Sequence, residues 1–505
     1  MKKVSSAIVP IITIDREGQL PLHRQVYDRY RAAILDSSLR PGQRVPSTRT
    51  LASELGVSRT PVVDAYAQLL AEGYFESRVG HGTVVSRSLT AQIRGSEASS
   101  SRCASPRLGR RPRALRARNL EPVQTGPRQR GHGAFCCGRV PFEHIPLQVW
   151  NRLITRHCRS TSATSLDYGD PMGSRNLREA IAVYLRTARG VRCDTDQIMI
   201  VCGSLHALEI STRALLEPGS RVWVEEPGYP FARNTLALHG CQIVPVPVDG
   251  QGLVVNVGIK KCRKAQAALV TPSHQMPLGV TMSATRRLQL LEWAENSGAW
   301  IIEDDYDSEY RYEGMPIASL QGLDRNFRVL YTGTFSKVLF PSLRLGYLVL
   351  PSDLIETFQE VRMAMDTFSP AFYQEVLADF IREGHFSRHI RRMRSLYAER
   401  RRTLIECLRQ ELGLTDEVSG AHAGTYLVLT LNGISERAIA ERAAGRGLWL
   451  LPLSPFYASK PSRQGLVLGY GSTPLEEIPK AVRKLREVLA GSVAGTRMNH
   501  PKRLP

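Results

Sequence analysis

One lysine stands apart from the other basic residues of this sequence. The chain has 67 lysines and arginines, but only ten of them are lysines, and Lys337 is the only lysine between Lys264 and Lys460. It lies in the apolar stretch TGTFSKVLFPSLRLGYLVL and not among charged residues. A lysine in such surroundings can lose its proton and attack an aldehyde, whereas an arginine stays protonated. Lys337 is therefore a candidate for covalent chemistry.

Two other groups suit the same chemistry. Asp304, in IIEDDYD, is of the type that keeps a pyridine nitrogen protonated. A Gly203-Ser204 turn at the start of a helix, joined by an arginine, is of the type that binds a phosphate dianion. Aldehyde, pyridine ring and phosphate occur together in pyridoxal 5'-phosphate (PLP). Each group alone has an ordinary alternative, because a single lysine is usually solvated and EDDYD also fits an exposed acidic turn or a metal site. The combination in this chain order favours PLP.

These residues need a sheet to position them. From Asp196 onward, apolar runs such as QIMIVCG, RVWVEEPGY, CQIVPVPVD, AALVTPSH and AWIIEDDYD alternate with helical patterns, one of them near Ala284–Ser297. This alternation predicts an α/β fold with a mainly parallel central sheet wrapped by helices. Ligands bind such sheets beyond the carboxyl ends of the strands. The polar exceptions fall at these ends: Gly203, Ser204, Tyr229, His274, Asp304, Tyr306 and Lys337.

A second pattern precedes this domain. LPLHRQVYDRYRAAILDSSLRPG predicts one helix, and VPSTRTLASELGVSRTPVVDAYAQLLAEGYF predicts two more, capped by Ser47 and Ser58 and separated by a turn at Gly56. YFESRVGHGTVVS then predicts a β-hairpin. This order is that of a winged helix-turn-helix, whose third helix enters the major groove of DNA. A small helical domain used for protein contacts is the alternative.

Charge and composition divide the chain. Between residues 87 and 133 there are eleven arginines and two glutamates, which supply +9 of the net charge of +20. This segment is poor in apolar residues and is expected to be flexible. We predict a winged helix-turn-helix over residues 15–86, a basic linker over 87–134, a PLP-binding domain over 135–490 and a disordered tail over 491–505. The charge favours nucleic acid as a partner, although a solvated basic surface would also explain it.

Composition also limits the location and the metal content. No apolar run approaches the roughly 20 residues that span a bilayer, and the N-terminus does not resemble a signal peptide. The nine cysteines follow no metal-binding spacing and are expected to be reduced thiols. We expect a cytoplasmic protein with no membrane association and no metal site.

The motifs themselves resemble known families. PGQRVPSTRTLASELGVSRTPVVDAYAQLLAEGYFESRVGHGTVV resembles the GntR family of bacterial transcription regulators. YGDPMG, CGSLHALEI, VEEPGYPFAR, VTPSHQMPLGV, IIEDDYDSEY and YTGTFSKVLFPSLRLGYLV are similar to fold-type I aminotransferases of class I. Their fusion resembles the MocR/GabR regulators and covers almost all of residues 17–490.

The resemblance implies roles for individual residues. Lys337 would form the Schiff base with PLP, Asp304 would face the pyridine nitrogen, Tyr306 the ring hydroxyl, and Tyr229 would stack on the ring. The phosphate would be held by Gly203, Ser204, Thr334 and Arg344, with Tyr168 reaching it from the partner subunit of a homodimer. Carried over in the same way, the DNA contacts would be Arg49, Ser58, Arg59, Thr60, His81 and Gly82. Arg78 is a further candidate because its charge suits a phosphate.

Three positions depart from the aminotransferase pattern. Met276 stands where these enzymes usually have an asparagine, and GLVLGYG lacks the arginine that binds a substrate carboxylate. Arg233 is a candidate to replace that arginine. His206 stands where the family more often has glutamine, and the sequence offers no physical account of it.

We therefore expect a PLP-dependent transcription regulator that binds operator DNA and senses an amine, an amino acid or PLP itself. The alternative is an active PLP-dependent aminotransferase with an accessory DNA-binding domain. A DNA-binding protein whose large domain binds nothing is a third possibility, which the intact set of Lys337, Asp304, Tyr306 and Arg344 disfavours.

Overall fold

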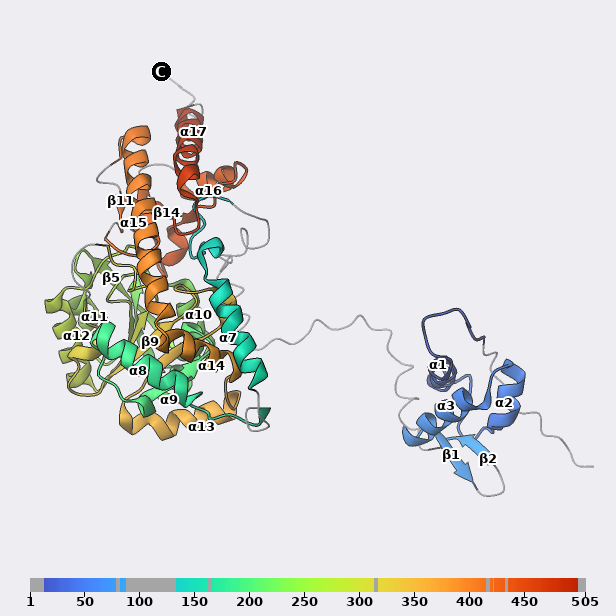
Figure 1. The fold of residues 1–505 in the computed structure, drawn as a ribbon. Helices are drawn as coiled ribbons and strands as arrows, with labels where there is room; N and C mark the ends of the chain where they lie inside the picture. The colour runs from blue at the N-terminus through green and yellow to red at the C-terminus, as the bar shows by residue number, and fades with distance from the viewer. Residues whose placement is uncertain are drawn as a thin grey trace, which may run out of the picture. The chain divides into compact units, whose positions relative to one another are not determined.

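The chain folds into two compact units, Met1–Arg107 and Leu108–Pro505, in a computed structural model (Figure 1). The structure describes residues 13–78, 82–87, 133–160, 166–312, 317–414, 418–420, 422–431 and 435–497. His81 and nearly all of the predicted linker lie outside these ranges. The two units are described separately below.

The smaller unit has the order helix, helix, helix, hairpin. Its elements are α1 (Leu22–Leu35), α2 (Thr48–Leu55), α3 (Arg59–Ala71), β1 (Phe75–Arg78) and β2 (Gly82–Val85). Tyr30, Tyr66 and Phe75 pack edge to face in its core, with ring centroids 5.1 to 5.6 Å apart. These three rings join α1, α3 and the hairpin, so the unit has a core of its own. The predicted winged helix-turn-helix is confirmed.

The turn between α2 and α3 follows the expected capping chemistry with one difference. The Oγ atom of Ser47 accepts from the N–H of Thr50 at 3.1 Å. Gly56 ends α2 with a φ of +62°, in the left-handed region that favours glycine. Ser58 is the N-cap residue of α3, but its side chain forms no capping hydrogen bond. The capping bond predicted for Ser58 is therefore wrong.

The larger unit is built on an eight-stranded sheet with the strand order β3-β10-β9-β8-β7-β4-β5-β6. Strands β5, β4, β7, β8 and β9 run parallel to one another, whereas β6 pairs antiparallel with β5, and β10 pairs antiparallel with both β9 and β3. Every residue of β3, β9 and β10 is buried, and in β3 (IMIV) this burial is matched by a continuous apolar run. The mainly parallel sheet was predicted correctly. Its strands are β3 (Ile198–Val201), β4 (Arg221–Glu226), β5 (Gln242–Asp249), β6 (Gly252–Leu253), β7 (Ala267–Val270), β8 (Trp300–Asp305), β9 (Val329–Thr334) and β10 (Gly346–Val349).

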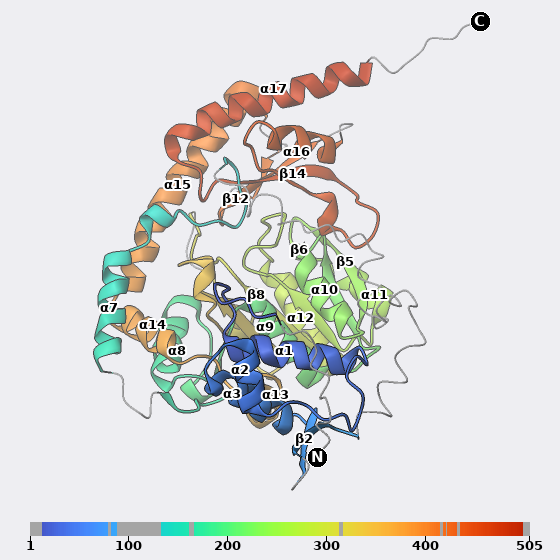
Figure 2. The same cartoon turned by 90° about the vertical axis from the view of Figure 1, so that its right-hand side faces the viewer.

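Helices cover the large sheet, and the chain then continues into a smaller sheet that packs with its own helices. The long helix α15 runs beside α17 next to a smaller antiparallel sheet of order β11-β12-β14-β13 (Figure 2). The helices are α7 (Leu147–Arg159), α8 (Arg175–Arg189), α9 (Ser204–Leu215), α10 (Pro230–Leu238), α11 (Val255–Cys262), α12 (Ala284–Ser297), α13 (Ile355–Met365), α14 (Phe372–Arg382), α15 (His385–Leu412), α16 (Glu436–Ala444) and α17 (Ile478–Arg497). The smaller sheet contains β11 (Val418–Ser419), β12 (Tyr426–Leu431), β13 (Leu451–Pro452) and β14 (Gln464–Gly469).

The C-terminal helix is longer than the sequence pattern indicated. The backbone of α17 is helical to Arg497, whereas the predicted domain ended at residue 490. The predicted disordered tail therefore begins too early, because a single glycine such as Gly491 is tolerated inside a helix at modest cost. Among the described residues, no helix has the length and apolar character needed to cross a bilayer.

The sheet topology explains how distant residues meet. Gly346 pairs with both Val201 and Thr334, so the end of β3, the end of β9 and the start of β10 lie at one edge of the sheet. The parallel strands β4, β7 and β8 end at the same edge, since β7, β8 and β9 follow one another in register. The residues that follow these strands are the ones that the sequence marked as candidates for chemistry.

Candidate functional site

Lys337 lies just beyond the end of β9, at the shared edge of the sheet. Its Nζ atom donates to the carbonyl oxygen of Gly138 at 3.3 Å. A side chain at Gly138, which has a φ of +76°, would place a carbon 2.8 Å from this nitrogen. The chain therefore leaves room around the amine by placing a glycine there.

Asp304 lies near the end of β8, and its Oδ1 atom is buried without a hydrogen-bond partner among the described residues. Burial, together with the negative charges of Asp305, Asp307 and Glu225, raises the pKa of this carboxyl to about 7, while Lys337 opposes this shift. A cation placed beside Asp304 would relieve this cost, because it would pair the charge and supply a donor. A protonated pyridine nitrogen is such a cation.

The Asp304 carboxylate is expected to destabilise the protein when no ligand is bound. Its pKa rises from an ordinary 3.8 to about 7 on folding, so the folded state holds more protons between these values, and the free energy of unfolding falls as the pH rises through this window. Asp304→Asn should therefore raise the melting temperature of the cofactor-free protein by a few degrees at pH 8, and by less at pH 5. Thermal unfolding at both pH values checks this. A variant no more stable than wild type at pH 8 would contradict it.

Tyr306 belongs to a buried polar cluster next to Asp304. Its hydroxyl lies 2.9 Å from the Tyr426 hydroxyl, 3.2 Å from His274 Nδ1 and 3.9 Å from Met276 Sδ. The same histidine nitrogen lies 3.0 Å from a carboxylate oxygen of Asp307. Burial raises the pKa of Tyr306 well above its ordinary value, so its hydroxyl keeps its proton and can donate to a ring oxygen. Met276 contributes a weakly accepting sulfur where an asparagine would contribute an amide.

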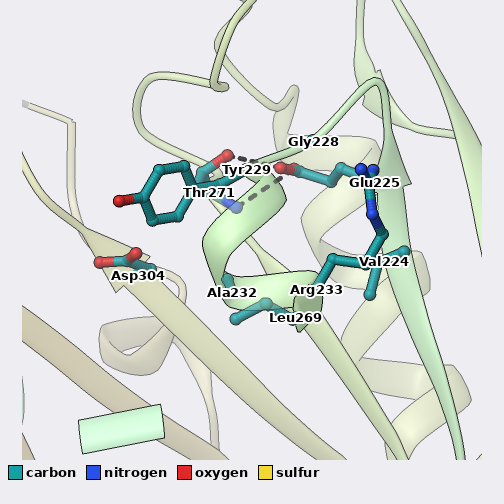
Figure 3. Close-up of a pocket in the computed structure, with 9 residues that line it drawn as sticks. All are labelled: Val224, Glu225, Gly228, Tyr229, Ala232, Arg233, Leu269, Thr271 and Asp304. Atoms are coloured by element: carbon teal, nitrogen blue, oxygen red, sulfur yellow. Dashed lines mark hydrogen bonds between the residues drawn. The ribbon is translucent and has the colours of Figure 1, made fainter. Parts of the chain in front are cut away.

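Tyr229 is the N-cap residue of α10 and lines a cavity together with Asp304. Figure 3 shows the Tyr229 ring and the Asp304 carboxylate at the same end of this cavity. Glu225 lies deeper and accepts hydrogen bonds from the N–H and the hydroxyl of Thr271, at 3.1 and 2.5 Å. An aromatic ring and a carboxylate on one cavity suit a flat heterocycle with a protonated nitrogen.

Arg233 lines the same cavity, but its contacts differ from the prediction. Its two terminal nitrogens donate to the carbonyl oxygens of Phe456 and Pro455, both at 3.1 Å, and the side chain is buried. Arg233 thus holds the segment between β13 and β14 against α10. This placement does not favour the predicted contact with an effector carboxylate, because both nitrogens already bind main-chain oxygens.

A cradle for an oxyanion forms where α9 begins. Gly203, its N-cap residue, has a φ of +102°, and a methyl group there would lie 3.6 Å from Arg344 Nη1 and 3.9 Å from Thr334 Oγ1. Ser204 is the first residue of α9, so it lies at the helix N-terminus, where free N–H groups are available to an oxyanion. Arg344 has a φ of +51°, an arrangement that costs about 1 kcal/mol or more. In the described part of the chain, its side chain forms no hydrogen bond or ion pair.

Tyr168 is separate from this cradle within one chain. Its side chain is 83% exposed, and its ring packs against that of Phe368, with centroids 5.9 Å apart. The role predicted for Tyr168 needs a second subunit.

The predicted DNA contacts lie on exposed parts of the smaller unit. Arg49 is exposed on α2, and Ser58, Arg59 and Thr60 are exposed at the start of α3. The Nε atom of Arg59 donates to Thr48 Oγ1 at 3.3 Å, which fixes the side chain and leaves its terminal nitrogens for a ligand. Because Ser58 makes no capping bond, its hydroxyl is also available.

One residue beside the hairpin, Arg44, was not singled out by the sequence pattern. Gly82 begins β2 with a φ of +78° and pairs with Arg78. A methyl group at Gly82 would lie 3.4 Å from the guanidinium of Arg44, which is exposed beside the hairpin. Arg44 is therefore a further candidate for a phosphate contact. Its isolated bridge with Val84 has no sequence signature.

The site also contains residues that the sequence left unassigned. Tyr426 comes from β12 in the smaller sheet, and Arg189 forms an ion pair with Asp305 at 2.7 Å directly beside Asp304. No group of three or more histidine, cysteine, aspartate or glutamate side chains suited to a metal occurs within the described ranges. The residues that do converge can hold an aldehyde-bearing pyridine by its nitrogen, ring oxygen, ring face and phosphate.

Two family models match this chain. Residues 134–484 match the family described as aminotransferase class I and II, and residues 22–85 match the bacterial regulatory proteins of the gntR family. The probable rhizopine catabolism regulatory protein MocR of Rhizobium meliloti is 39% identical over 94% of this chain and 95% of that protein. The HTH-type transcriptional regulator YhdI of Bacillus subtilis, whose function is uncharacterized, is 35% identical over 94% of this chain and 97% of that protein.

A similar fold occurs in a solved aminotransferase. The kynurenine aminotransferase of Pyrococcus horikoshii has a TM-score of 0.67 and 27% identity, covering 78% of this chain and 97% of the other. That structure contains PMP. The relatives that match along nearly the whole chain are regulators, and the solved aminotransferase matches a smaller share of it.

Proposed function

This chain belongs to the MocR-type transcription regulators, in which a GntR-family DNA-binding domain precedes an aminotransferase class I and II domain, and from this premise we propose that its large domain binds PLP and uses it to sense an amine or an amino acid. The observation that carries the proposal is the convergence of Lys337, Asp304 and the Gly203–Arg344 cradle at one edge of the sheet. An occupied PLP site would then control how the DNA-binding domains engage an operator.

The residues fit the cofactor at each of its groups. PLP, when bound, supplies an aldehyde that a lysine amine captures and a ring that withdraws electrons. Lys337 would hold the cofactor covalently, and Asp304 would keep a proton on the ring nitrogen while regaining a partner for its buried Oδ1 atom. Tyr306 would donate to the ring oxygen, and Tyr229 would cover one face of the ring.

The phosphate would lie in the cradle formed by Gly203, Ser204, Thr334 and Arg344. The unpaired guanidinium and the helix N-terminus both favour a dianion there. Tyr168 would complete the cradle from the partner subunit of a homodimer, which accounts for its exposure within one chain. These assignments are proposals about this chain's own residues.

An effector would need to exchange with Lys337 for the cofactor. No arginine occurs among Leu466, Val467 and Leu468, which are fully buried in β14. Since Arg233 is also engaged elsewhere, neither of the two positions considered for an α-carboxylate, β14 and Arg233, offers an available guanidinium in the described part of the chain. We therefore favour an effector recognised mainly through its amine.

An active aminotransferase is the second candidate function, and the complete Lys337–Asp304–Tyr306 set favours it. We nevertheless expect little turnover, because the missing asparagine at Met276 and the missing arginine in β14 remove orientation and electrostatic help, each commonly worth about 10²-fold in rate. Steady-state assays with a panel of amino donors and keto acids check this. Turnover at about 1 per second or faster would replace the regulator-only proposal with the enzyme.

The experiment that tests the proposed function measures the response of both domains to the same amine. PLP-loaded protein is screened with amines by the change in its visible absorption, and each active amine is then tested for its effect on binding to a DNA fragment selected by the protein from a random library. A regulator of the proposed kind should give at least one amine that changes both signals. Amines that change the absorption without altering DNA binding would contradict it.

A further inference from the structure

His206 is the departure from the family pattern that the sequence could not explain. It is the third residue of α9, one turn from the cradle. Its Nδ1 atom accepts a hydrogen bond from the N–H of Cys202 at 3.0 Å. An unprotonated ring nitrogen is required to accept this bond. Burial, followed by the charge of Arg362, lowers the pKa of His206, which favours that neutral form.

The other ring nitrogen of His206 faces a different segment. Nε2 lies 3.6 Å from a carboxylate oxygen of Asp366, which follows α13. Asp366 in turn lies 2.9 Å from the Nε atom of Arg362, whose side chain is fully buried. Arg362 also donates to the hydroxyl of Ser369 at 2.6 Å. The histidine therefore stands between the cradle and the segment 366–369.

This segment is held in an unusual conformation. Thr367 has a φ of +65°, and a β-branched residue in this region is a genuine outlier. Its N–H donates to the carbonyl oxygen of Arg362 at 3.0 Å. The Arg362 side chain contacts Asp366 on one side of Thr367 and Ser369 on the other. Strained backbone of this kind persists only where the surroundings fix it.

The far side of the segment contacts the loop that carries Tyr168. A methyl group at Gly169 would lie 2.8 Å from the ring of Phe368, so these two residues are in close contact. The Phe368 ring also packs against that of Tyr168. A continuous set of contacts thus joins Cys202 to Tyr168 through His206 and the segment 366–369.

We propose that His206 is a positioning residue that anchors the phosphate loop 202–204 and couples it to the segment 366–369, and through Phe368 to Tyr168. The coupling to a bound phosphate rests on the proposed PLP site, whereas the anchoring of the loop does not. When the cradle is occupied, the loop and the Tyr168 region would be ordered together.

The two ring nitrogens can be separated by substitution. In His206→Asn the side-chain oxygen takes the place of Nδ1 and keeps the Cys202 bond, but the contact toward Asp366 is lost. His206→Leu removes both contacts and keeps a side chain of similar volume. His239→Asn is the matched control, because His239 pairs with Glu209 at 2.7 Å and does not touch the loop.

The measurement is amide hydrogen exchange of wild type and the three variants, without and with PLP, alongside spectral titration of PLP. Without PLP, His206→Leu should speed exchange at Cys202 about tenfold, while His206→Asn and His239→Asn should not. With PLP, His206→Leu should bind about tenfold more weakly, and His206→Asn should bind nearly as wild type. Wild type and His239→Asn should gain protection over both 366–369 and 166–170, and His206→Asn should gain it only around 202–204.

The outcomes separate the two proposals. Unchanged exchange at Cys202 in cofactor-free His206→Leu would overturn the anchoring role, whatever the cofactor does. Full protection of 366–369 by PLP in His206→Asn would overturn the coupling. If the wild-type protein binds no PLP, the proposed cofactor and the coupling that depends on it are wrong. Faster exchange at Cys202 in His206→Leu would still support the anchoring role in that case.

Discussion

Replacing Lys337 with alanine is expected to abolish the yellow colour that the wild-type protein takes on with PLP. The colour requires an amine that joins to the cofactor's aldehyde, and Lys337 is the amine that β9 delivers to the edge shared by Asp304 and Arg344. Lys337→Arg should fail equally, because it keeps the positive charge but stays protonated. The measurement is visible absorption after incubation with PLP, followed by borohydride reduction and peptide mapping.

The control for this experiment is Lys460→Ala, which removes an exposed lysine far along the chain. This variant should colour as wild type does, and mapping should place the reduced cofactor on Lys337 alone. The full-length Lys337→Ala variant should still bind DNA through its winged helix, but its DNA binding should no longer respond to amines. A colourless wild type, or a Lys337→Ala variant that still responds to an amine, would end the case for PLP as the sensor.

Much of the fold was predictable because the buried strands have recognisably apolar sequences. β3 is buried at every residue, so its segment is a continuous apolar run, and the helix predicted near Ala284–Ser297 begins and ends at these residues. Once the strands are parallel, the polar residues that follow them must meet at one edge. Lys337 and Asp304 could be placed together for this reason.

Other parts of the site could not be predicted, because they depend on packing between distant segments. Tyr426 reaches Tyr306 from a strand 120 residues away, and nothing in its local sequence marks it. Arg233 looked available for a carboxylate because a sequence shows the donor but not the carbonyls of Pro455 and Phe456 that occupy it. His206 had no explanation until the N–H of Cys202 and the carboxylate of Asp366 were seen on its two sides.

The second large effect is expected in the DNA-binding domain. Arg59→Ala should lower affinity for the operator by about 1–3 kcal/mol and relax the choice of base at one position, if its terminal nitrogens contact a guanine. The structure supports this because Thr48 Oγ1 already accepts from Nε at 3.3 Å, which restrains the side chain and leaves its two terminal nitrogens for a base. Thr48→Val should weaken the same preference to a smaller extent, since it frees the arginine without removing it.

Arg49 provides the contrast that separates base recognition from phosphate binding. Arg49→Ala should weaken binding to operator and scrambled DNA alike and flatten the slope of log affinity against log salt concentration by about one unit. Salt-dependent binding of both DNAs by wild type, Arg49→Ala, Arg59→Ala and Thr48→Val distinguishes the roles. Equal losses on operator and scrambled DNA for Arg59→Ala would mean that Arg59 does not read the sequence, and that the specificity of this regulator comes from other residues.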